Sequence, residues 1–159
     1  MFDARDSETI IRRAEQVILY ANIVMILMVV IHDIDHVRQA HHMNYTIGLQ
    51  LWLVNISVYI PSFVALAMRW KRLRIAAPMT VANGIFVGAA FSEVHLWRPT
   101  IPVWGMWNDN FFELGADSTS WTVLAVTVFV GASVAMAGTY AAGLYWAANR
   151  KSLVKGAIA

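Results

Sequence analysis

The sequence predicts an all-α integral membrane protein, in which four transmembrane helices form an antiparallel bundle within one domain, residues 1–159. Three observations support this fold class. Hydrophobic residues make up 58% of the 159 residues and charged residues only 14%, which is unusual for a soluble domain. Four segments are apolar over roughly 20 residues, the length needed to cross a hydrocarbon core of ~30 Å. The tryptophans lie near the ends of these segments, as expected at membrane interfaces.

The first predicted span covers residues 17–37. Residues 1–16 mix acids and arginines at helical spacings, and we expect them either to lie on the cytoplasmic surface or to extend this span inward. Asn22 is a strongly polar side chain within the first span, and Asn55 and Asn83 occupy comparable positions in the next two spans. Such amides usually form hydrogen bonds between helices, so we expect them to hold the bundle together.

The second and third predicted spans cover residues 47–68 and 75–96. The basic connection between them is short, so these two helices are expected to be neighbours that run in opposite directions. Gly84 and Gly88 are four residues apart in the third span, and this pattern of small residues allows close contact between helices.

The fourth predicted span covers residues 121–147 and follows an outer loop, residues 97–120. This span carries small residues on a single helical face: Gly131, Ala135, Gly138 and Ala142. We expect this face and the glycine face of the third span to pack against a second copy of the chain or a larger membrane protein.

The charges are distributed unequally between the two ends of the predicted bundle. Because Lys and Arg accumulate on the cytoplasmic side of membrane proteins, we expect both termini to be cytoplasmic, in the plasma (inner) membrane. The expected partners are the lipid bilayer and not nucleic acid. Ten of the twelve basic residues fall on the cytoplasmic side: Arg5, Arg12, Arg13, Arg69, Lys71, Arg72, Arg74, Arg150, Lys151 and Lys155. The outer side has all five histidines and six acids.

A cluster of histidines and acids at the outer end of the first span is the leading candidate for a functional site. His32, Asp35 and His36 are spaced i, i+3 and i+4, so they share one face of a helix. His95 ends the third span and is expected to point into the bundle. Imidazole and carboxylate are the ligands that Zn, Fe, Cu and Mn prefer when thiolate is absent, and this chain has no cysteine.

The sequence therefore predicts a divalent transition-metal site formed by His32, Asp35, His36 and His95, facing the extracytoplasmic side. Charged residues near this site are candidates for supporting or acid–base roles: Glu93, Glu113, Arg38 and Arg98. A metal in such a site could activate water or oxygen toward a lipid-like substrate, which would make the protein an enzyme.

Other interpretations of the same residues are open at this point. Helix ends at a membrane interface often carry His, Asp and Arg only because water begins there. His41 and His42, in the segment that follows, are expected to be solvated. A haem b protein would use His32 or His36 together with His95 as axial ligands, and quinone binding is a related alternative. The chain could also be a non-catalytic accessory subunit of a larger membrane complex.

Overall fold

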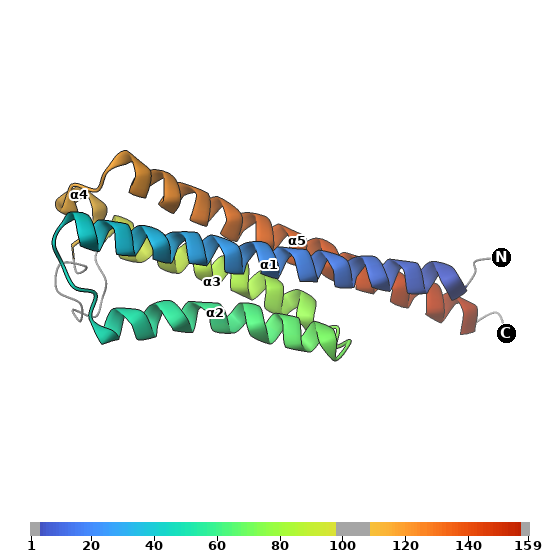
Figure 1. Cartoon of the computed structure of the whole chain (residues 1–159). Coiled ribbons are helices and arrows are strands. Elements are labelled where there is room, and N and C mark those ends of the chain that lie inside the picture. The colour runs from blue at the N-terminus through green and yellow to red at the C-terminus, as the bar shows by residue number, and fades with distance from the viewer. Residues whose placement is uncertain (1–3, 98–108, 157–159) are drawn as a thin grey trace.

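The computed structural model describes residues 4–97 and 109–156. Of these residues, 87% are helical, and no strand occurs among them. Figure 1 shows long helices that lie side by side, with a short helix at one end. The helices are α1 (Ala4–His42), α2 (Leu49–Trp70), α3 (Ala76–Leu96), α4 (Phe111–Leu114) and α5 (Ser118–Gly156).

The first and last helices, α1 and α5, are much longer than α2 and α3. Each has 39 residues, about 58 Å at 1.5 Å per residue, whereas α2 has 22 residues and is about 33 Å long. α1 and α5 therefore extend beyond α2 and α3 at the end where the chain begins and ends (Figure 1). The α1–α2 connection, the last turn of α3 and α4 lie together at the opposite end.

Helix α1 is longer than the span predicted at residues 17–37, because no Gly or Pro interrupts residues 4–42. The N-terminal segment thus extends the first span, which was one of the two expectations. α1 ends where Asn44 adopts a left-handed backbone conformation with φ of 52°. The outer loop predicted at residues 97–120 contains α4 and the first turn of α5, so it has more regular structure than expected.

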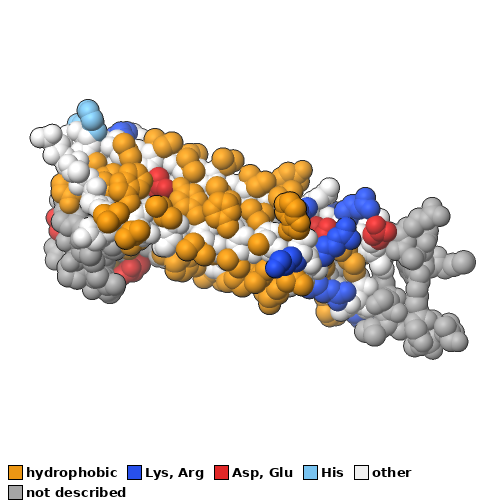
Figure 2. Space-filling view, turned by 60° about the horizontal axis from the view of Figure 1, so that its bottom comes forward, with side chains coloured by type: hydrophobic (Ala, Val, Ile, Leu, Met, Phe, Trp, Pro, Cys, Tyr) orange, Lys and Arg blue, Asp and Glu red, His pale blue; other side chains and the backbone are white. Residues whose placement is uncertain are grey.

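Three of the described helices are long and apolar enough to cross a membrane: residues Asp6–His42, Leu49–Trp70 and Ser118–Arg150. Large apolar side chains on these helices point outward, such as Ile34, Ile56 and Phe129, which are all at least 60% exposed. Figure 2 shows hydrophobic side chains over the middle of one face, with Lys and Arg gathered towards the end that carries the chain ends. The chain thus has the surface of a membrane protein. Span 75–96, which corresponds to α3, stays a prediction.

Buried amides connect three of the helices, as expected. Nδ2 of Asn22 on α1 donates to Oγ1 of Thr80 on α3 at 2.9 Å. Nδ2 of Asn83 donates to Oδ1 of Asn22 at 3.1 Å and to Oγ of Ser62 on α2 at 2.8 Å. These hydrogen bonds hold α1, α2 and α3 together in the middle of the molecule.

The small residues of α3 and α5 pack against each other. A Cβ atom added to Gly84 would lie 2.5 Å from the backbone of both Gly131 and Ala135, and one added to Gly138 would lie 2.7 Å from the backbone of Val81. Only glycine allows such an approach of two backbones. These faces are therefore occupied within the chain, and the predicted contact of the same faces with a second copy or a larger partner is untested.

Candidate metal centre

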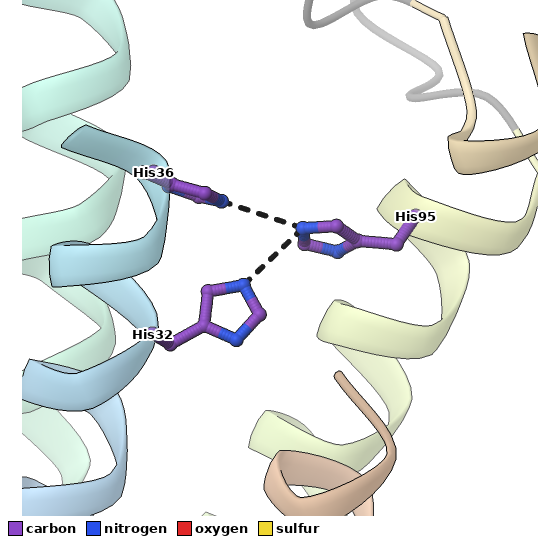
Figure 3. A group of neighbouring side chains, drawn as sticks. All are labelled: His32, His36 and His95. Carbon is purple, nitrogen blue, oxygen red and sulfur yellow. Dashed lines mark hydrogen bonds between the residues drawn. The ribbon is translucent and has the colours of Figure 1, made fainter. Parts of the chain in front are cut away.

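Three buried histidines converge between α1 and α3. His32 and His36 lie one turn apart on α1, and His95 lies in the last turn of α3. Nε2 of His95 is 3.2 Å from Nε2 of His32 and 3.4 Å from Nε2 of His36 (Figure 3). One nitrogen of each ring lies within 4.8 Å of the other two. Because the three side chains are only 1%, 5% and 6% exposed, the interpretation of this cluster as a solvated helix end is wrong.

Two of the imidazoles are oriented by an acceptor at their other nitrogen, Nδ1. Nδ1 of His32 is 3.0 Å from Oγ1 of Thr127 on α5, and Nδ1 of His95 is 2.8 Å from the carbonyl oxygen of Phe91. A carbonyl oxygen can only accept, so Nδ1 of His95 carries the hydrogen. The hydroxyl of Thr127 also lies 2.7 Å from the carbonyl oxygen of Val123, and when it donates its hydrogen there, its oxygen accepts from Nδ1 of His32.

These hydrogen-bond partners determine whether the Nε2 atoms of His32 and His95 carry a hydrogen or a lone pair. A neutral imidazole has one N–H group, and when Thr127 accepts, that group is at Nδ1 in both His32 and His95. In this tautomer their Nε2 atoms face each other with lone pairs at 3.2 Å. Two buried acceptors at this distance repel, whereas a cation between them would be bound by both.

The third imidazole, His36, contacts an amide group that can be placed in either of two orientations. Nδ2 of Asn55 on α2 lies 3.2 Å from Nδ1 of His36. With this amide orientation, Nδ1 of His36 accepts and its Nε2 carries the hydrogen, which is donated to His95. Turning the amide by 180° brings Oδ1 to the same position, so that Nδ1 becomes the donor and Nε2 presents a lone pair that a metal could bind. Asn55 thus fits both states of His36.

Two of the three separations between these nitrogens match those of zinc ligands, and the third pair, His32 and His36, lies within 4.8 Å. Two imidazoles bound to zinc at about 2.0–2.1 Å and at the tetrahedral angle have their nitrogens about 3.3 Å apart. The observed separations from His95, 3.2 and 3.4 Å, lie on either side of that value. Three protein ligands leave one position of a tetrahedral site open, as in catalytic zinc sites.

Aromatic side chains surround the histidines and exclude water. The ring of Phe91 contacts His32 with centroids 4.2 Å apart, and the ring of Phe111 contacts His95 at 4.6 Å. Phe111 is 2% exposed and is supplied by α4. The short helix holds it in place through a capping box, in which Asn110 and Glu113 each accept a backbone N–H of the other. Low polarity around a metal strengthens its electrostatic interactions.

Asp35, a predicted ligand, is engaged with other residues. Its Oδ1 accepts from Nε of Arg38 and its Oδ2 accepts from Nε2 of Gln39, both at 2.7 Å. Arg38 also donates to both carboxylate oxygens of Asp117 and to Ser120, which joins α1 to the beginning of α5. The hydrogen bonds from Arg38 hold the pKa of Asp117 well below its ordinary value of 3.8. Asp35 thus positions Arg38, and the two carboxylates leave this network with a negative charge near the histidines.

The other predicted supporting residues lie away from the three nitrogens. Glu93 is partly buried and does not belong to the group of converging ligand atoms, and Glu113 is exposed and caps α4. Arg98 lies outside the described residues. His41 and His42 are exposed in the last turn of α1, as expected.

A cavity of about 90 Å³ lies beside the centre, between α2 and α3. Its polar lining is formed by His36, Asn55 and His95, and the rest of its wall is apolar.

The site roles of Asn55, Thr127 and Phe111 were not predicted from the sequence. Asn55 was expected only to hold helices together, although a polar residue inside an apolar span was a usable signal. Thr127 had no signal, because a threonine in a helix usually bonds its own backbone, as Thr127 also does here.

No family model, curated protein or solved structure matches the chain.

Proposed function

We propose that the chain is a multi-pass membrane protein that binds one divalent transition metal through Nε2 of His32, His36 and His95. The observation that carries this proposal is the convergence of three buried histidines, with Nε2 of His95 3.2 Å from Nε2 of His32 and 3.4 Å from Nε2 of His36. The geometry suits Zn, and Fe, Cu and Mn share the preference for imidazole ligands to different degrees. Asp35 and Asp117 add negative charge nearby, which favours a bound cation.

The proposed topology has four spans in an antiparallel arrangement, with α3 as the span between α2 and α5, all in one domain. Both chain ends are proposed to be cytoplasmic, in the plasma (inner) membrane, and the histidines to face the extracytoplasmic side. Three apolar helices and the basic residues at the end that carries the termini support this arrangement.

A metal with an open position supplies Lewis-acid or oxygen chemistry when it is bound. We propose that the chain uses it on a lipid-like substrate. The residues of the chain would then hold the three imidazoles through Thr127, Asn55 and the Phe91 carbonyl, and exclude water through Phe91 and Phe111.

Haem b does not fit this arrangement. Axial ligands of a haem lie on opposite faces of a wide planar ring, whereas Phe91 and Phe111 pack directly against the rings of His32 and His95 and leave no gap for a porphyrin. The cavity of about 90 Å³ beside the histidines is also far too small for a porphyrin.

The test is elemental analysis of detergent-purified protein together with its visible absorption spectrum. We expect near-stoichiometric Zn, Fe, Cu or Mn in the wild-type protein and its loss from the variant His36→Ala, His95→Ala. The matched control is His41→Ala, His42→Ala, because these histidines are exposed on the same helix. Equal metal content in all three proteins would overturn the proposal, and so would a haem spectrum that the first variant loses.

A further inference from the structure

The cavity between α2 and α3 joins the histidine centre to the outer surface of the helices. His36, Asn55 and His95 form its polar end. Val54 and Val58 of α2 and Ala90 of α3 are among the apolar residues that line the rest. His32 does not line it, because that ring faces Thr127 on α5. The open side of the centre is therefore the side of α2 and α3.

The mouth of the cavity lies among side chains that face the membrane. Val54 lines the cavity and is still 39% exposed, and its neighbours on α2, Leu53 and Ile56, are exposed apolar residues. α2 is one of the helices long and apolar enough to span a membrane. A molecule that enters between Val54 and Ala90 would thus come from the lipid and not from water.

The size of the cavity limits what can enter. A cavity of about 150 Å³ lined by apolar residues binds benzene, and this cavity of about 90 Å³ is smaller. A short unbranched alkyl segment needs less space than a ring and fits this volume better. The polar end adds a second requirement, since a ligand that reaches His36 and His95 must place a polar atom there rather than a methyl group.

We infer that this cavity takes an unbranched alkyl chain with a terminal oxygen function, which enters sideways from the bilayer with the oxygen leading. The oxygen reaches the fourth position of the metal, and the first carbons of the chain lie between Val54, Val58 and Ala90. This inference rests on the proposed metal site and names the substrate class for it.

The test uses photoactivatable fatty acids and protein reconstituted in phosphatidylcholine–phosphatidylglycerol nanodiscs. One probe carries a diazirine close to the carboxylate, and a second carries it at the methyl end. Labelled peptides are identified by mass spectrometry. Two pairs of variants are compared: Ala90→Leu, which fills the cavity, with Ala89→Leu, and Val54→Trp with Leu53→Trp. Ala89 and Leu53 are exposed neighbours that do not line the cavity.

We expect the carboxylate-end probe to label α2 and α3 peptides that line the cavity, and the methyl-end probe not to label them. Labelling should be lost in Ala90→Leu and Val54→Trp and kept in both controls. Equal labelling by the two probes, or loss in the controls as well, would overturn the inference. So would equal labelling by a phosphatidylcholine that carries the diazirine in its acyl chain.

The metal content of the same samples separates the two proposals. Cavity labelling without any bound metal would contradict the proposed function and leave the chain-binding cavity in place. Bound metal without cavity labelling would contradict the chain-binding cavity and leave the proposed metal site in place. A cobalt-loaded wild-type protein gives a further check, because its visible spectrum should shift with dodecanoate and not with the same concentration of acetate.

Discussion

Nδ2 of Asn55 lies 3.2 Å from Nδ1 of His36, so the orientation of one amide determines which nitrogen of this imidazole carries the hydrogen. The two residues come from different helices, and the amide can turn without any change in the backbone. This contact links the hydrogen-bonded state of the three histidines to their metal-binding state.

The first prediction concerns this contact. Asn55→Leu removes the partner of Nδ1 and should weaken metal binding about 10–100-fold, the usual effect of losing a group that orients a ligand. Asn55→Asp should strengthen binding, because a carboxylate accepts from Nδ1 and makes the imidazole more basic. Competition with a chelator of known affinity measures both. The control is Ser57→Ala, which changes an exposed residue on the same helix. Equal metal affinities of Asn55→Leu, Asn55→Asp and this control would contradict the prediction.

Thr127 provides a second test at His32. Thr127→Val keeps the shape of the side chain but removes the oxygen that accepts from Nδ1, so metal affinity should fall about 10-fold or more. Thr139→Val is a suitable comparison, since Thr139 also donates to the carbonyl four residues earlier but is exposed. If both variants bind metal like the wild type, Thr127 does not orient His32.

The contact between α3 and α5 predicts a difference between two glycines. Gly84→Ala places a Cβ 2.5 Å from backbone atoms of α5, and overpacking of this kind should lower the free energy of unfolding by about 1–3 kcal/mol. Gly143→Ala meets nothing within 4 Å and should be neutral or stabilising, because alanine is the better helix former. Unfolding in mixed detergent micelles compares them. Equal stability of the two variants would show that the close contact is absent.

The ion pair between Arg38 and Asp117 predicts a dependence of stability on pH. The pKa of Asp117 is lower in the folded protein than its ordinary value of 3.8, so the carboxylate stabilises the fold above that value. This contribution is lost as pH falls below 3.8 towards the lower pKa of the folded state. Asp117→Asn should therefore lower the melting temperature at neutral pH, and its difference from the wild type should shrink on acidification through this range.

The control for this measurement is Asp109→Asn, another exposed carboxylate in the described part of the connection before α5. The difference in melting temperature between Asp109→Asn and the wild type should not shrink on acidification. A difference between wild type and Asp117→Asn that stays constant from neutral to acid pH would exclude the ion pair as its cause.

The meeting of three histidines could be predicted because two independent patterns pointed to it. His32 and His36 share a face by their spacing, and His95 follows Gly84 and Gly88 on the packed face of the third span. The role of Asp35 could not be predicted in the same way. Its spacing suits a ligand, but Arg38 and Gln39 lie three and four residues further on and bind both of its oxygens.

The contact of α5 with the histidines was the part that the sequence did not predict. Whether Thr127 reaches His32 depends on the rotation of α5 about its own axis, and an apolar helix with small residues permits several rotations. The close packing of Gly84 on Gly131 and Ala135 selects one of them. The span prediction of residues 17–37 left the length of α1 open, although the absence of Gly and Pro from residues 4–42 is a signal for one continuous helix.

The contact of Gly84 with α5 also affects which metal the site would bind most tightly. α3 carries His95 and α5 carries Thr127, the residue that orients His32, and the two helices meet backbone to backbone. Backbones in direct contact cannot move apart or closer as side chains can, so the position of Thr127 relative to His95 is nearly fixed. An ion that needs a planar arrangement would have to distort this frame, whereas a tetrahedral ion would not. Rigidity of the scaffold would then oppose the general preference of nitrogen ligands for copper over zinc.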